Sequence, residues 1–197
     1  MKGSSLARTP EQRGFTLVEL LIVVSLVAVV LGLAGPSFTS FIQMQRLKSI
    51  NAQLVTDLQS ARSEAVGRNV PVYVRFGEAA NMSCYVLYTT TSMPPAHCDC
   101  LTGTCASGAT KIRATEVPAD SAVTVSARTL NAFDHFSFDP RTGGMVVRMD
   151  DGRPVTPDEY LIDVSLDAAR KLRDKVGPTG RVAVCKPAGS TMTNPGC

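Results

Sequence analysis

The stretch RGFTLVELL, from Arg13 to Leu21, sets a carboxylate at the head of a long apolar run. The run continues to Gly35, and Glu19 is the single charged residue between Phe15 and Phe38. About 20 residues of α-helix cross a hydrocarbon core, so residues 15–38 are predicted to form a transmembrane helix segment. An ionised carboxylate in such a segment is costly, and it requires a partner.

The residues around this run predict its orientation. Arg8 and Arg13 lie on its N-terminal side, so the N-terminus is predicted to be cytoplasmic and the bulk of the chain to lie across the membrane. All six cysteines come after residue 80, which favours an oxidising compartment there. The formal charge of +3 over 197 residues is too small to argue by itself for a nucleic-acid partner.

An ordinary signal peptide is the alternative interpretation of the same run. Its marks are a basic segment, an apolar core and the small residues of Gly32-Leu33-Ala34, and cleavage there would give a secreted soluble protein. Against it, a helical pattern continues beyond Pro36. Apolar residues at spacings of three and four mark one buried helix face: Leu47, Ile50, Leu54, Leu58, Ala61 and Ala65. Residues 39–68 are therefore predicted to be an amphipathic continuation of the helix, with Asp57 and Arg62 off its buried face.

Beyond Gly67 the pattern changes from helical to alternating. Apolar residues from Val70 to Phe76 alternate with other side chains, as in a half-buried strand. Further strands are predicted over residues 84–90, 123–127, 136–138, 145–149, 161–166 and 181–185. The section between Asn81 and Lys111 is expected to be largely an insertion-tolerant loop. Residues 69–197 are therefore predicted to be a β-rich globular domain, and a helix followed by strands gives the α+β class.

The run from Arg13 to Leu21, with the apolar span and Pro36, resembles the class III signal of type IV pilins and type II secretion pseudopilins. The resemblance implies that residues 1–14 are a leader peptide, that a prepilin peptidase cuts between Gly14 and Phe15, and that the new amine of Phe15 is methylated. It also implies a single pass through the inner membrane, with the N-terminus cytoplasmic and the globular domain periplasmic.

The same resemblance offers a partner for Glu19. In this family the equivalent carboxylate pairs with the N-terminal ammonium of a neighbouring subunit when the helices bundle into a filament. Pairing offsets part of the cost of burying each charge, and it does so only in the assembled state. The alternative is local: Thr16 and Glu19 have the spacing of a capping box, in which the side chains bind backbone amides at the start of a helix.

Two motifs of the C-terminal half resemble the GspH/FimT family of minor pilins and pseudopilins. They are Phe138-Asp139-Pro140 with Gly143, and the run from Pro178 to Val182 that leads to Val184-Cys185. The resemblance implies a pilin-like fold, with the long helix packed on an antiparallel sheet. It implies a structural subunit of a type IV pilus or type II secretion filament and no enzyme, with other subunits, the prepilin peptidase and the inner membrane as partners.

Some FimT proteins bind DNA in natural transformation through a C-terminal Gly-Arg-x-Arg motif, which makes DNA binding an alternative function. In Gly180-Arg181-Val182-Ala183 an alanine stands in place of the second arginine. The possible DNA contacts are then Arg181 and Lys186. Two cations do not make a phosphate-binding stripe, so the filament role is favoured.

The cysteines are expected to form disulfides. Cys98, Cys100 and Cys105 with His97 superficially suggest a metal site, but they lack the paired spacing of common zinc sites. A bridge between Cys185 and Cys197 is predicted, and another among Cys84, Cys98, Cys100 and Cys105. His135 beside Asp134 has no nucleophile motif to serve, and no nucleotide-binding fingerprint occurs. No catalytic residue, metal or cofactor is therefore predicted.

Overall fold

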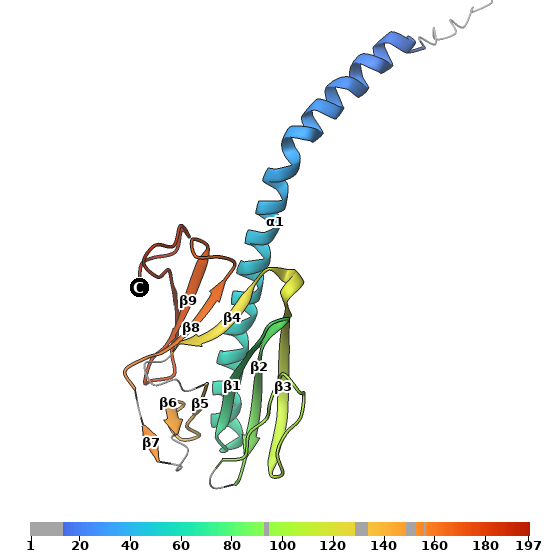
Figure 1. Ribbon diagram of the computed structural model, residues 1–197. Helices are drawn as coiled ribbons and strands as arrows, with labels where there is room; N and C mark the ends of the chain where they lie inside the picture. The colour runs from blue at the N-terminus through green and yellow to red at the C-terminus, as the bar shows by residue number, and fades with distance from the viewer. Residues whose placement is uncertain (1–13, 93–94, 129–133, 149–152, 156) are drawn as a thin grey trace, which may run out of the picture. The chain divides into compact units, whose positions relative to one another are not determined.

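The computed structural model describes residues 14–92, 95–128, 134–148, 153–155 and 157–197, with the backbone alone for residues 33–37. The chain divides into two compact units, residues 1–41 and residues 42–197. One long helix, α1 (Leu17–Arg68), supplies the described part of the first unit and continues into the second (Figure 1). The prediction that one helix continues through residues 15–38 and 39–68 agrees with the bounds of α1.

The sequence explains both ends of α1. At the start, Thr16 accepts a hydrogen bond from the Glu19 amide through Oγ1 (3.2 Å), as an N-cap residue does. At the end, Asn69 adopts a left-handed conformation with φ of 53°. The Asn69 amide then donates to the Val66 carbonyl and the Val70 amide to the Ala65 carbonyl, both at 3.3 Å. This pair of bonds is a Schellman motif, which satisfies the last carbonyls and turns the chain into the first strand.

The rest of the second unit folds into antiparallel strands in two sheets, which Figure 1 shows beside the C-terminal part of α1. The first sheet has the order β3-β2-β1-β5-β6-β7 and the second the order β10-β9-β8-β4. The strands of the first sheet are β1 (Val72–Ala79), β2 (Met82–Thr90), β3 (Ala109–Pro118), β5 (His135–Phe138), β6 (Met145–Arg148) and β7 (Pro154–Val155). Those of the second are β4 (Thr124–Arg128), β8 (Tyr160–Ser165), β9 (Lys171–Val176) and β10 (Val182–Cys185). The 3-10 helix η1 (Ala119–Ser121) joins the two sheets.

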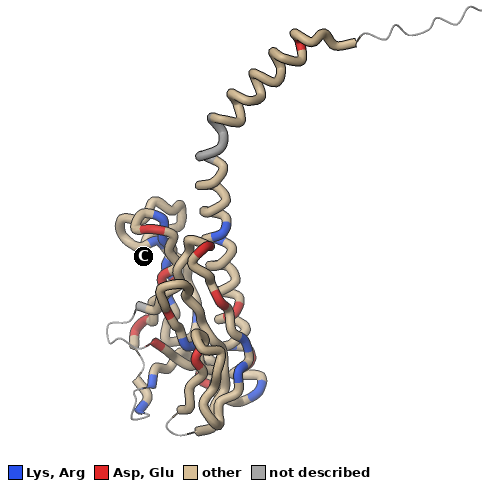
Figure 2. Tube along the Cα trace, turned by 45° about the vertical axis from the view of Figure 1, so that its right-hand side comes forward, with Lys and Arg blue, Asp and Glu red and all other residues tan. Residues whose placement is uncertain are grey.

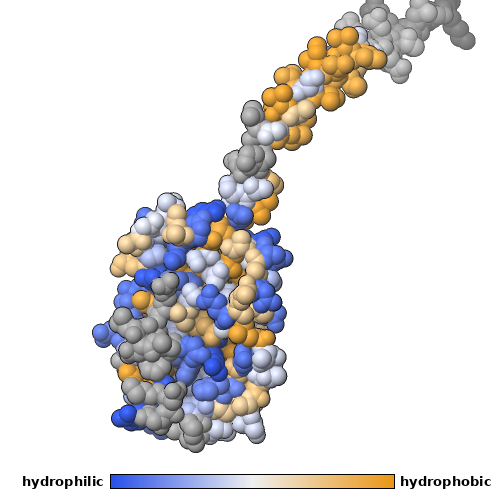
Figure 3. All heavy atoms as spheres, viewed as in Figure 1, coloured by the Kyte–Doolittle hydropathy of each residue, from blue (hydrophilic) through white to orange (hydrophobic). Residues whose placement is uncertain are grey.

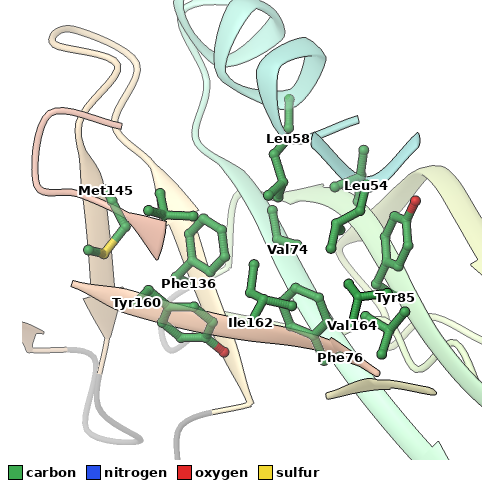
Figure 4. Close-up of a cluster of buried hydrophobic side chains, with 14 of the residues drawn as sticks. Leu54, Leu58, Val74, Phe76, Tyr85, Phe136, Met145, Tyr160, Ile162 and Val164 are labelled. Atoms are coloured by element: carbon green, nitrogen blue, oxygen red, sulfur yellow. The ribbon is translucent and has the colours of Figure 1, made fainter. Parts of the chain in front are cut away.

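The main core lies between α1 and the inner faces of both sheets. Helix residues of the predicted stripe are buried there: Leu47, Leu54, Leu58, Ala61 and Ala65. Figure 4 shows Leu54 and Leu58 pointing toward Val74 of β1. The buried face differs from the prediction at three positions. Two polar residues, Asn51 and Asp57, are buried, and Ile50 of the predicted stripe is only half-buried.

The first sheet is covered on its outer face as well. A second cluster of buried side chains lies there: Tyr73, Cys84, Val86, Tyr88, Cys98 and Cys100. Its cover is a small hairpin after β2, in which Cys98 and Cys105 form a bridge and the Ala106 amide donates to the His97 carbonyl (2.9 Å). Gly77 lies close beneath this cover, and a Cβ there would lie 3.0 Å from the Cys100 sulfur, so the covering side chains would have to shift to admit it.

The expectation of a loop between residues 81 and 111 is therefore wrong in part. All of β2 and the start of β3 lie in this section, and the described residues between them form no long strand. The strands β3, β7 and β9 were not predicted. The predicted strand over 145–149 is observed as Met145–Arg148, and Met149 lies outside the described residues.

Candidate functional site

The predicted processing junction lies at the exposed start of α1. Gly14 and Phe15 precede the helix, and Phe15 is 81% exposed. A Cβ added at Gly14 would meet no heavy atom within 4 Å. The backbone on both sides of this peptide bond is thus open to solvent in the molecule. The remainder of the predicted leader, residues 1–13, lies outside the described part of the chain.

Glu19 lies in the first turn of α1 and is exposed. Its amide donates to Thr16 Oγ1, and the Leu20 amide donates to the Thr16 carbonyl (3.1 Å), which starts the helical hydrogen-bond ladder. The first bond of a capping box is therefore present, and it uses the backbone of Glu19. The carboxylate projects into solvent and is accessible to a group from another molecule.

The first unit carries an exposed apolar surface. Every described side chain from residue 14 to residue 32 is exposed, and Figure 3 shows hydrophobic residues along this part of the helix. The large apolar side chains from Leu17 to Leu31 are 50% to 79% exposed. Hardly any charged residue occurs there, as Figure 2 shows. A contiguous apolar surface of this kind marks a membrane or protein contact. Within the part of the chain that is described, no helix is found that combines the length and the apolar character required to cross a membrane.

The two motif turns of the C-terminal half meet at one residue of α1. Arg62 Nε donates a hydrogen bond to the Gly143 carbonyl (3.0 Å), and the Met145 amide donates to the Pro178 carbonyl (3.0 Å). Gly180 has φ of 75°, and a Cβ there would lie 2.0 Å from the Gly143 oxygen. Only glycine fits between these backbones. The motifs thus have a structural role: they lock two turns together and against the helix.

Asp139 shapes the first of these turns. Its Oδ1 accepts hydrogen bonds from the amides of Arg141 (3.0 Å) and Thr142 (2.9 Å) and from the Thr142 hydroxyl (3.0 Å). The bond from the Thr142 backbone is the largest of the effects that lower the pKa of Asp139. The turn is therefore held by a carboxylate that stays ionised at neutral pH.

Asp57 is a second anchor of α1, although its position in the sequence was predicted to lie off the buried face. Its side chain is 2% exposed, and it accepts hydrogen bonds from the Tyr85 hydroxyl (2.8 Å) and from Arg113 Nη1 (2.6 Å). Burial raises the pKa of the Tyr85 hydroxyl, which therefore remains a hydrogen-bond donor. The helix is thus fixed to β2 and β3 by a carboxylate. The sequence feature that could have predicted its burial is its spacing of three residues from Leu54, which places both on one helix face.

The two candidate DNA contacts do not converge. Arg181 is exposed just before β10, where it borders a groove that Gln59 and Arg62 of α1 also line. Lys186 is half-buried just after β10, and its backbone pairs with the C-terminal segment at Gly196. They are five positions apart, which in an extended chain is roughly 16 Å and places them on opposite faces of the strand. Together they form no continuous cationic stripe.

All six cysteines form disulfides. The pairs are Cys84–Cys100, Cys98–Cys105 and Cys185–Cys197. The predicted Cys185–Cys197 disulfide is present, and the four earlier cysteines form two disulfides. Since none is a free thiol, none is available as a thiolate metal ligand. Among the described residues, no group of three or more His, Cys, Asp and Glu side chains is arranged to hold a metal ion.

His135 and Asp134 form a structural contact at the start of β5. His135 is buried, and its Nδ1 lies 2.9 Å from Asp134 Oδ1, while Arg75 Nε donates to Asp134 Oδ2 (2.8 Å). Burial alone would raise the pKa of Asp134, but the hydrogen bonds from His135 and Arg75 outweigh it and lower the pKa to about 2. The carboxylate is thus fully engaged with its two neighbours.

Comparison with known proteins identifies two matching families. The model of the prokaryotic N-terminal methylation motif matches residues 10–35, and that of type II transport protein GspH matches residues 51–180. No curated protein matches the chain. Among solved structures, the type IV minor pilin FimU of Pseudomonas aeruginosa strain PAO1 in space group P21 is 17% identical, with a TM-score of 0.49 over 78% of this chain and 98% of that chain. A second crystal form, P65, is 16% identical, with a TM-score of 0.45 over 75% and 98%.

Proposed function

Because this chain belongs to the family of type II transport protein GspH, a family of minor pilins and pseudopilins, we propose that it enters or primes a periplasmic filament. The family consists of structural subunits that are anchored in the inner membrane and assemble with other pilin or pseudopilin subunits. The observation that carries the proposal is the exposed apolar surface of residues 14–32, headed by a single carboxylate. Lipid would cover this surface before assembly, and neighbouring helices would cover it in the filament.

Processing is the first step of the proposed function. A prepilin peptidase would cut the exposed bond between Gly14 and Phe15 and methylate the new amine of Phe15. Mass spectrometry of the N-terminal peptide of the membrane-associated protein tests this step. The expected mature chain begins with N-methylated Phe15 and retains residues 15–38 as its membrane anchor. A mature chain that begins near Gly35 would refute the proposal and would support an ordinary signal peptide.

Glu19 would give the assembly its register. Cleavage at Phe15 creates an ammonium, and a neighbouring helix would place that charge against the Glu19 carboxylate. Either charge alone is expensive in an apolar setting, and the ion pair offsets part of this cost. A misaligned helix would leave both charges buried and unpaired, so the pair would favour one axial position. The exposed carboxylate is free for this role, because the observed capping bond uses the backbone amide of Glu19.

The matched variant Glu19→Gln separates pairing from capping. A glutamine at this position preserves the capping-box chemistry but carries no charge. We therefore expect Glu19→Gln and Glu19→Ala to be cleaved normally and to be incorporated into filaments poorly, by tenfold or more. Thr16→Ala, which removes the observed cap but keeps the carboxylate, should be incorporated nearly as well as the wild type. The readout is the fraction of processed subunit recovered with sheared filaments, and normal incorporation of Glu19→Gln would leave capping as the role of Glu19.

The two alternative functions are not favoured. The matched methylation motif is a mark of helix retention, whereas an ordinary signal peptide is removed. For DNA binding, Arg181 and Lys186 offer two separated cations, which is less than a backbone-tracking surface requires.

A further inference from the structure

A polar pair joins α1 to the second sheet inside the core. Asn51 lies on the buried face of α1 and Asp174 within β9, and these residues are 4% and 0% exposed. Asn51 Nδ2 donates a hydrogen bond to Asp174 Oδ1 over 3.3 Å. The second polar atom of each side chain, Asn51 Oδ1 and Asp174 Oδ2, is buried with no hydrogen-bond partner among the described residues. Two unpaired oxygens therefore belong to one contacting pair.

If Asp174 were ionised, Asn51 Oδ1 and Asp174 Oδ2 would both be left without a hydrogen-bond donor. Asn51 Oδ1 and an ionised Oδ2 are both acceptors, and an unsatisfied buried acceptor carries its full desolvation cost. A proton on Asp174 Oδ2 changes this, because the resulting hydroxyl can donate to Asn51 Oδ1. The amide and the acid would then exchange two hydrogen bonds in one ring, and every polar atom of the pair would be satisfied.

We propose that Asp174 is held as a neutral acid that closes a two-hydrogen-bond ring with Asn51, so that α1 is clasped to β9 in a proton-dependent way. The pair lies on the inner face of the second sheet, where Leu47 and Leu54 flank Asn51 one helical turn away on each side. Acidification through neutral pH strengthens the clasp, and alkalinisation weakens it. The docking of the helix onto the domain is thereby coupled to the pH of the compartment.

The neighbouring strands offer no cation that faces Asp174. On β8, its register partner is the apolar Ile162, and the nearby charge is the carboxylate of Asp163. On β10, its register partner is the apolar Val184. Arg173 precedes it on β9, but side chains alternate along a strand, so Arg173 lies on the other face and binds Asp163 there (2.7 Å).

The remaining charged groups are also occupied or distant. Lys171 and Lys175 share the outer face of β9 with Arg173, and they pair with Asp163 and Glu159. On α1, the buried or half-buried ionisable side chains in the described range are Asp57, Arg62 and Glu64, about two to four helical turns beyond Asn51. The surroundings of Asp174 thus favour its neutral form.

The sign of the pH effect follows from the two states of the chain. Burial, with a smaller effect of the Asp163 charge, raises the pKa of Asp174 to about 7 against the opposing hydrogen bond from Asn51. In the unfolded chain an aspartate titrates near pH 4. Between these values the folded protein binds a proton that the unfolded chain lacks. This contribution to stability is complete below about pH 4 and is lost as the pH rises through about 7.

The test compares urea unfolding of the full chain in detergent micelles with that of Asp174→Asn. The variant keeps the shape of the acid, and its amide can donate to Asn51 Oδ1 at every pH. The ratio of the two unfolding constants should change about tenfold per pH unit between about pH 4.5 and 6.5, with the wild type losing stability as the pH rises. Glu116→Gln, at an exposed position of β3, is the matched control and should leave the wild-type profile unchanged. Parallel profiles for wild type and Asp174→Asn would overturn the proposal.

A second measurement needs no variant and stands even where Asp174→Asn fails to fold. The carboxyl carbon of Asp174 in the folded wild-type chain is followed by NMR as the pH is changed. A midpoint close to neutral supports the clasp. A midpoint at or below about pH 4, the ordinary value for an aspartate, would show that the acid is ionised in the core and would overturn it.

Discussion

Replacing Gly180 with alanine should destabilise the domain far more than the same change at Gly189. Both glycines have left-handed conformations, with φ of 75° and 82°. Both variants therefore carry the conformational cost of a left-handed alanine, about 1–2 kcal/mol. They differ in their surroundings, because a Cβ at Gly180 would lie 2.0 Å from the Gly143 oxygen, whereas a Cβ at Gly189 would meet nothing within 4 Å.

The additional cost at Gly180 follows from the movement that relieves this contact. The two turns must separate by roughly 1 Å, since real Cβ contacts closer than 3.0 Å hardly occur. Overpacking of this kind costs about 1–3 kcal/mol. The Arg62 hydrogen bond to the Gly143 carbonyl would be lost as well, which costs about 1 kcal/mol. We expect a loss of about 3–6 kcal/mol for Gly180→Ala and about 1–2 kcal/mol for Gly189→Ala.

Urea unfolding, followed by the near-ultraviolet circular dichroism of the tyrosines, measures both losses under identical conditions. A difference of less than about 1 kcal/mol between the two variants would refute the argument that the motif turns are packed backbone against backbone. The glycine of the C-terminal motif would then have to be explained by a contact with another molecule.

Two further predictions concern the anchors of the domain. Asp57→Ala leaves the Tyr85 hydroxyl buried without its acceptor and should lower the free energy of unfolding by about 3 kcal/mol. The double variant Asp57→Ala with Tyr85→Phe should lose less than the sum of the two single changes. Additive losses in urea unfolding would contradict the direct contact. Replacing Cys185 and Cys197 together with serine opens a loop closed over a separation of 12 residues and should cost about 3 kcal/mol, and an unchanged unfolding midpoint would be inconsistent with the bridge.

The helix and most strands could be predicted because their apolar residues repeat with a clear period. Leu54 and Leu58 show the pattern of a buried helix face, and Val72 and Val74 that of a strand. In β9 the pattern is hidden, because Lys171 and Arg173 stand on one face and the inner face includes the buried Asp174. From the sequence alone, a carboxylate is predicted to lie on the surface, because its buried partner on another element is not visible there.

Edge position explains why β3 was not predicted. β3 pairs with β2 alone, and most of its residues are exposed, so few of them need to be apolar. Among the candidate site residues, Glu19 stands out in the sequence because an apolar run surrounds it. Asp57 and Arg62 do not stand out, because their roles depend on Tyr85 and Gly143, which are far away in the sequence.

The first two disulfides interleave along the chain, since Cys98 lies within the loop that Cys84 and Cys100 close, and Cys105 lies beyond it. Four cysteines allow three pairings, and loop length alone does not select the native one, because Cys100 is closer in sequence to both Cys98 and Cys105 than to its partner Cys84. The native pairing instead depends on the hairpin of β1 and β2, which presents Cys84 beside Gly77 at the place where Cys100 fits. We therefore expect strand pairing to precede the Cys84–Cys100 bond in oxidative folding. A chain oxidised with other pairings before its hairpin forms would have to exchange those bonds to reach the native set.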